Sequence, residues 1–188
     1  MAVRMWRMYQ RWLVTDPWKS QTITSGVIVS AGDIISQQVV EKRGLAHHDF
    51  KRTLRMATVG LCLGPILRSW YLTLERFVPS TSRPVLDGFK KMLPDQLLFA
   101  PCVSVAFFWI NNTFAGGTFE ELKKKLNERY VETLLNGYKV WPAVQMVNFT
   151  IVPFQYRIGV VQLVAVLWNA YLSWQVNKPT SSDKEITG

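Results

Sequence analysis

The sequence predicts an all-α integral membrane protein, a bundle of about four transmembrane helices with additional amphipathic helices at the membrane interface. Hydrophobic residues fill 48% of the 188 positions, and most charged residues lie between long apolar stretches. These stretches are centred near Ile28, Gly60, Val105 and Val164. Such segregation is typical of spans joined by loops. The eight Trp and six Tyr residues agree with it, because amphipathic rings accumulate at the edges of a bilayer.

Length and charge limit the domain count and the function classes. We expect one membrane domain, residues 1–177, followed by a polar tail, residues 178–188. The chain carries 22 basic and 13 acidic residues, a net charge of +9. The basic residues are spread over every loop without a nucleic-acid-binding module, so membrane lipids are the expected partners and direct nucleic acid binding is not expected. No catalytic constellation, cofactor motif or metal-ligand spacing is present, so an enzyme is not expected.

The N-terminus predicts a short basic helix that lies in the membrane interface. Arg4, Arg7 and Arg11 precede the first acidic residue, Asp16, and aromatic residues recur between them at helical spacing. A helix of this kind places its apolar face in the bilayer and its basic face among the headgroups.

The first span is expected at residues 18–40, which as a helix would reach about 35 Å and cross a hydrocarbon core of about 30 Å. Small and polar residues recur along it every three or four positions: Thr22, Gly26, Ser30, Asp33 and Gln37. This spacing places them on one helix face, which we expect to contact protein or water rather than lipid.

The second span is expected at residues 54–74, where Gly60, Gly64 and Arg68 share a face. The two glycines allow another helix to approach closely, either within the bundle or in a larger assembly. Asp33 of the first span is the expected partner of Arg68. The two charges would form an internal ion pair that fixes helix packing; lining a lumen is the alternative.

The third span is expected at residues 93–113, with Asp95 at its start beside Pro94. Two interpretations of Asp95 stay open from the residues alone. An aspartate after a break is a favourable helix N-cap at the interface. A carboxylate near a pore mouth, in contrast, would set the ion preference of a channel. Residues 118–134 then predict a separate charged amphipathic helix that lies on the membrane or beneath the bundle.

The last region predicts a fourth span, residues 134–154, and a further apolar helix, residues 158–176. A single helix from Trp141 to Trp174 would be about 51 Å long, well beyond one span. Pro153 and Arg157 interrupt it, and the last helix is either re-entrant or interfacial, or a fifth crossing. Four amides recur every seven residues and are expected on one face, where they line a lumen or join helices: Asn148, Gln155, Gln162 and Asn169.

Thr81 lies in the polar second loop, before Arg83 and Pro84. Its hydroxyl is a candidate phosphorylation site, because a phosphate near the mouth of a membrane pathway would change the local charge. Ordinary loop polarity explains the residue equally well.

Several strings resemble the family of the Mpv-seventeen protein and the 22-kilodalton peroxisomal membrane protein. The resemblance runs nearly from end to end. Its most specific strings are Gly32-Asp33-Ile34-Ile35-Ser36-Gln37-Gln38, Asp95-Gln96, Ala100-Pro101-Cys102, Trp141-Pro142-Ala143-Val144-Gln145, Asn148-Phe149, Tyr156-Arg157 and Tyr171-Leu172-Ser173-Trp174. The first and last of these look most like the mitochondrial inner membrane member of the family.

The resemblance implies a four-span protein of the mitochondrial inner membrane, with the peroxisomal membrane as the alternative. It implies a non-selective channel for small solutes or ions that modulates membrane potential and reactive oxygen species homeostasis and supports mitochondrial DNA maintenance. It also favours the channel role for Asp95. A homo-oligomer or a larger inner-membrane complex is an expected assembly. The alternative function is a non-conducting membrane protein that organises such a complex through the face of Gly60 and Gly64.

Overall fold

A computed structural model of the chain describes residues 2–114 and 116–177, so the expected polar tail, 178–188, lies outside the described residues. The regular structure within those ranges is helical. The main helices are α1 (Ala2–Thr15), α2 (Pro17–Ile35), α3 (Phe50–Phe77), α4 (Pro84–Pro94), α5 (Ala100–Phe114), α6 (Phe119–Thr150) and α7 (Arg157–Asn177). Shorter turns extend or join them: η1 (Ser36–Val40), η2 (Leu45–His47), η3 (Asp95–Phe99) and η4 (Phe154–Tyr156).

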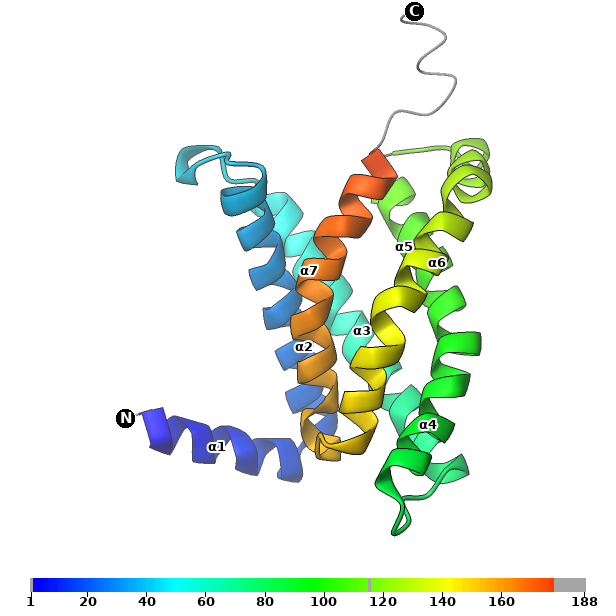
Figure 1. The fold of residues 1–188 in the computed structure, drawn as a ribbon. Helices are drawn as coiled ribbons and strands as arrows, with labels where there is room; N and C mark the ends of the chain where they lie inside the picture. Colours follow the sequence, from blue (N-terminus) through cyan, green and yellow to red (C-terminus); the bar gives the residue numbers. More distant parts are fainter. Residues whose placement is uncertain (1, 115, 178–188) are drawn as a thin grey trace, which may run out of the picture.

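The long helices stand side by side and alternate in direction, while α1 lies across one end of the bundle (Figure 1). We call this end the N-terminal end. It also holds the α3–α4 loop and the turn between α6 and α7. The link between α2 and α3 lies at the opposite end.

Helix α1 packs against the bundle through one face only. Leu13 is buried, the Tyr9 and Thr24 hydroxyls are 3.2 Å apart, and Gln10 donates a hydrogen bond to the Tyr156 hydroxyl (3.0 Å). The three N-terminal arginines of the predicted basic helix are exposed. The expected N-terminal helix is therefore confirmed, and its position in the membrane interface stays a prediction.

Helices α2 and α3 form an antiparallel hairpin with the most extensive contact in the bundle. A Cβ atom at Gly60 would lie 2.6 Å from the Ser25 carbonyl oxygen, and one at Gly64 would lie 2.7 Å from the Thr22 Cα. Glycine is therefore required where the two backbones touch, and the predicted role of this pair in close packing is confirmed. Because α2 occupies this face, it is not available for assembly into a larger complex.

The third span was expected at 93–113, but the helix runs unbroken from Pro84 to Phe114 through α4, η3 and α5. Pro84 occupies the first turn, where its missing N–H costs nothing. Pro94 lies inside the helix, and the π-helical turn η3 that follows absorbs its disturbance. Among the described residues, this is the one helix that is both long enough and apolar enough to cross a membrane, judged by length and composition alone.

The amphipathic helix expected at 118–134 and the span expected at 134–154 form one helix, α6, which ends at Thr150. Thr118 and Glu121 cap its start reciprocally, and Pro142 lies inside without ending it. Pro153 falls in the turn between α6 and α7, and α7 returns along α2 and α6. The expectation of a separate surface helix is wrong, because no break separates the charged and apolar parts.

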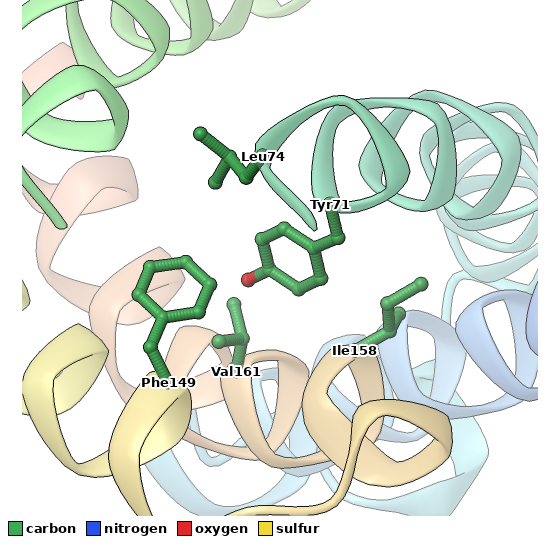
Figure 2. Close-up of a cluster of buried hydrophobic side chains, with 5 residues drawn as sticks. All are labelled: Tyr71, Leu74, Phe149, Ile158 and Val161. Carbon is green, nitrogen blue, oxygen red and sulfur yellow. The ribbon is translucent and has the colours of Figure 1, made fainter. Parts of the chain in front are cut away.

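A small apolar core joins three helices near the N-terminal end. Tyr71 and Leu74 of α3 meet Phe149 of α6 and two residues of α7, Ile158 and Val161 (Figure 2). The Tyr71 and Phe149 rings meet edge to face with centroids 5.4 Å apart. The Tyr71 hydroxyl points into the cluster, so this core also needs a polar partner.

We predict that Gly60→Ala lowers the free energy of unfolding by about 1–3 kcal/mol, because the new methyl group meets the backbone of α2 and forces it to shift. Thermal unfolding of purified protein in detergent, followed by tryptophan fluorescence, measures the loss. Gly159→Ala is the matched control, since a Cβ atom at Gly159 would meet no other group within 4 Å. Equal melting temperatures for the two variants would contradict the packing argument.

Candidate functional site

Burial in this protein is inverted relative to a water-soluble fold. Among the described residues, 17 buried side chains are polar or charged and 8 are hydrophobic. Large apolar side chains such as Leu97, Ile151 and Leu167 are exposed instead. This pattern suits hydrocarbon surroundings, where lipid solvates the outside and polar groups must find partners inside. The buried polar clusters are therefore the candidate functional sites.

Asp95 forms the centre of a buried polar cluster, with 2% of its surface exposed. Its carboxylate accepts three hydrogen bonds, from Trp70 Nε1 (2.8 Å), Gln96 Nε2 (2.8 Å) and Gln145 Nε2 (2.9 Å). Within the described chain, no cationic side chain forms an ion pair with it. The interpretation as an interfacial N-cap is wrong, because Asp95 lies inside a continuous helix.

The surroundings of Asp95 contain more acceptors than donors. Gln145 also donates to the Tyr71 hydroxyl (3.3 Å), and Asn148 donates to the Gln145 amide oxygen (3.1 Å). The amide oxygens of Gln96 and Asn148 are buried without a hydrogen-bond partner. Unsatisfied buried oxygens beside a carboxylate suit water molecules or a passing cation.

The π-helical turn η3 directs the side chains of this cluster into the bundle. Asp95 and Gln96 are neighbours in sequence, yet both are buried. The Trp70 ring stacks on Phe99 with centroids 5.0 Å apart, and the Tyr138 hydroxyl donates to the Gln96 carbonyl (3.1 Å). Side chains of α3 and α6 thus hold η3 from two sides. The sequence signal for this turn is the proline directly before it.

The predicted ion pair between Asp33 and Arg68 is wrong. Asp33 pairs with Arg52 at 2.7 Å and accepts hydrogen bonds from Gln37 (2.8 Å) and Thr53 (2.7 Å). In an antiparallel hairpin, residues that are equally distant from the connecting loop face each other. Asp33 lies near the loop and Arg68 far from it, so hairpin register alone excludes their contact.

Arg68 lies at the other end of the same helix pair and has no carboxylate partner among the described residues. Its guanidinium donates to Gln21 (3.0 Å) and packs over the rings of Trp18 and Phe154, 5.1 and 5.8 Å from their centroids. Its Nε atom is buried without a hydrogen-bond partner. A guanidinium between aromatic faces gains cation–π attraction that offsets part of its desolvation.

The four amides expected on one face are divided between three elements. Asn148 lies in α6 and Gln162 in α7, where Gln162 donates to Ser25 of α2 (2.6 Å). Gln155 lies in the turn η4, and its carbonyl accepts from Gln21 (3.5 Å). The prediction that the four amides share one helix face is wrong, because α6 ends between Asn148 and Gln155. The side chain of Asn169 lies outside the described residues.

Sequence reasoning missed a trio of charges at the N-terminal end. Glu75 Oε1 accepts from Lys91 Nζ (2.7 Å) and from Arg157 Nη1. Lys91 is 1% exposed and Arg157 is 7% exposed. Arg157 also donates to the Val152 and Phe149 carbonyls at the end of α6. Arg157 therefore closes the α6–α7 turn from inside the bundle.

Thr81 is exposed, and its hydroxyl and backbone N–H contact the carboxylate of buried Asp87 (2.9 and 2.5 Å). A phosphate on Thr81 would repel this carboxylate and release the loop. Phosphorylation of Thr81 stays a prediction.

A second ionic group lies at the opposite end, where Glu41 bridges Arg43 and Arg52, each at 2.6 Å. Partial burial acts to raise the pKa of the Glu41 carboxyl, but the two guanidinium groups outweigh it and lower this pKa below its usual value. Arg52 thereby connects Glu41 to buried Asp33.

We predict that Asp33→Asn lowers the free energy of unfolding by about 1–3 kcal/mol, because Arg52 loses its charged hydrogen bond to Asp33 and keeps only the one to Glu41. Chemical unfolding in detergent checks the value. Asp16→Asn is the control, since Asp16 is exposed and its side chain caps no backbone group.

The corresponding exchange of charges, Asp33→Arg with Arg52→Asp, should recover part of the loss relative to the single variants. The exchange of Asp33 with Arg68 should recover none. Recovery by the second exchange and not the first would overturn this assignment of partners.

Comparison with known proteins identifies the family of the chain. The sequence profile described as the Mpv17 / PMP22 family matches residues 112–173. The mitochondrial inner membrane proteins Mpv17 of Homo sapiens and Xenopus laevis are 46% and 45% identical to the chain, each over 93% of it and 98% of their own length. Protein SYM1 of Gibberella zeae is 35% identical over 89% of the chain and 95% of its own length. No solved structure matches the chain.

These relatives cover nearly the whole bundle and are named as membrane proteins, not as enzymes. Their names confirm the expected location in the mitochondrial inner membrane. The chain therefore belongs to the Mpv17 / PMP22 family.

Proposed function

We propose that the protein is a non-selective channel of the mitochondrial inner membrane. In this role it modulates the membrane potential and mitochondrial homeostasis and so supports maintenance of mitochondrial DNA. Small solutes or ions are the proposed permeants. The observation that carries the proposal is the Asp95 carboxylate, buried without a cation beside unpartnered amide oxygens. A charge kept inside a membrane bundle at such a cost is expected to serve ion passage.

Further polar clusters lie along the bundle on both sides of Asp95. Arg68 and Gln21 lie between α2 and α3, and Gln162 joins α7 to α2. Asp33 lies near the far end of α2 and the charged trio around Glu75 near the N-terminal end. Because these groups prefer water to hydrocarbon, helices that separate along them would admit a hydrated path.

Passage requires the bundle to open, since Asp95 is almost fully buried. Opening must break the hydrogen bonds from Trp70 of α3 and Gln145 of α6, so separation of these helices from η3 is the proposed gating motion. A carboxylate that moves through the membrane field couples this motion to voltage, by about 2.3 kcal/mol per elementary charge and 100 mV.

We further propose that five helices cross the membrane: α2 with η1, α3, the helix Pro84–Phe114, α6 and α7. The support is that α7 stands parallel to the other long helices and packs on α2 and α6, which a helix lying in the interface would not do. The charged first half of α6 would then extend beyond the hydrocarbon.

We predict that purified protein in planar bilayers shows discrete conductance steps, and that Asp95→Lys shifts the ion preference from cations toward anions. Unit charges 4 Å apart interact by about 4 kcal/mol at an effective dielectric constant of about 20, which is ample for such a reversal. Reversal potentials in a salt gradient measure the preference. Asp95→Asn should give an intermediate value.

Asp16→Lys makes the same charge change at an exposed position and should leave the preference unchanged. Folding of each variant is checked by circular dichroism. Silent bilayers with folded wild-type protein, or equal reversal potentials for Asp95→Lys and Asp16→Lys, would contradict the channel and favour a non-conducting protein that organises a larger complex.

A further inference from the structure

A shallow cavity of about 380 Å³, widely open to the outside, lies at the N-terminal end of the bundle and shares no lining residue with the Asp95 cluster. Its walls come from α3, the α3–α4 loop and the α6–α7 turn. The lining residues are Leu72, Glu75, Ser80, Phe154 and Arg157. Three of these side chains are polar or charged and two are apolar, so the cavity suits a ligand with a polar head and an apolar body.

Two cations share one carboxylate at this cavity: Arg157, which lines it, and Lys91, which lies behind the lining residues. Glu75 is the only carboxylate among its lining residues, and one oxygen of Glu75 serves both Lys91 and Arg157. The other oxygen accepts only from the Ser80 hydroxyl (3.3 Å) in the described contacts. A single carboxylate neutralises one of two buried cations, so the trio carries a net positive charge in a medium of low dielectric constant.

Phe154 brings a third cation close to the same cavity. The guanidinium carbons of Arg68 and Arg157 lie 5.8 and 5.7 Å from the centroid of its ring. Arg68 has no carboxylate partner among the described residues, and its Nε atom is buried and unpartnered. Both guanidinium groups therefore lie close to a ring that lines the cavity, where their charge would attract an anion.

The nearest other carboxylate does not cancel this excess. Asp87 lies close enough to Lys91 to interact electrostatically, but its hydrogen bonds go to the backbone and side chain of Thr81. With Arg68, Lys91 and Arg157 counted against Glu75 and Asp87, one positive charge is left over.

We propose that this cavity binds the phosphate group of an anionic phospholipid. Arg157 uses three of its N–H groups in hydrogen bonds to Glu75, Val152 and Phe149, which leaves two of its five for a phosphate oxygen. The Ser80 hydroxyl donates to Glu75 and accepts from Lys91, so it holds both side chains in place at the site. Leu72 and Phe154 accommodate the glycerol and the start of the acyl chains, where headgroups meet the end of the bundle.

Isothermal titration of the full-length protein in non-ionic detergent tests this site. Short-chain phosphatidylglycerol is the ligand and short-chain phosphatidylcholine, which is neutral overall, is the comparison. We expect phosphatidylglycerol to bind at least about tenfold more tightly, the equivalent of one charge-assisted hydrogen bond. Competition by inorganic phosphate assigns recognition to the phosphate alone; its absence assigns recognition to the intact headgroup.

Two neighbouring lysines give a matched pair of variants. Lys91→Gln removes a cation of the site and should weaken binding about tenfold, whereas Lys90→Gln removes an exposed one and should leave binding unchanged. Glu75→Gln keeps an acceptor oxygen for both cations but removes the competing negative charge, so it should tighten binding. If the trio had only a structural role, Glu75→Gln would not be expected to raise the affinity for the lipid.

The proposal is overturned if both lipids bind equally or if Glu75→Gln weakens binding. It is also overturned if folded Lys91→Gln and Lys90→Gln bind alike. Folding of each variant is checked by circular dichroism, and Glu75→Gln supplies the test if Lys91→Gln does not fold. Because binding is measured without conductance, failure of the lipid site leaves the channel proposal standing, and the reverse also holds.

Discussion

The structure depends on one constraint: hydrocarbon offers no hydrogen-bond partner, so polar side chains must pair within the bundle. Asp33 and Asp95 each accept from three side chains, most of which come from other elements of the bundle. Several of these pairs join residues far apart in sequence, such as Gln162 with Ser25 and Arg157 with Glu75. Since lipid packs against apolar faces as well as protein does, these polar contacts determine which helix faces meet.

Much of the helical architecture could be predicted from local sequence, because hydrophobic runs and small residues act over a few turns. The helices expected around residues 18–40, 54–74 and 158–176 all lie within helices of the structure. The close approach at Gly60 and Gly64 followed from their spacing. The pairing of Asp33 failed because charge complementarity was considered without hairpin register, which the loop position already contained.

Other features depended on contacts that local patterns do not encode. Pro94 suggested a helix start, but the helix continues past Pro94. Trp70 and Tyr138 hold the turn η3 that follows it by hydrogen bonds. Nothing in the local pattern around Glu75 and Lys91 marks them as partners of Arg157, which lies 82 residues after Glu75. Charges near a predicted span end are therefore ambiguous in sequence, since burial there is decided by the turn of a distant helix pair.

The π-helical turn also sets the rotational phase between α4 and α5. A π-turn holds one residue more than the corresponding α-helical turn, and each residue of an α-helix turns it by about 100°. Below the turn, Lys91 faces the interior; above it, Phe108 does so with no exposed surface. Deletion of one residue in Asp95–Phe99 would rotate α4 relative to α5, so that Lys91 and Phe108 could no longer both face the interior. The number of residues in this segment is therefore as important as their chemistry.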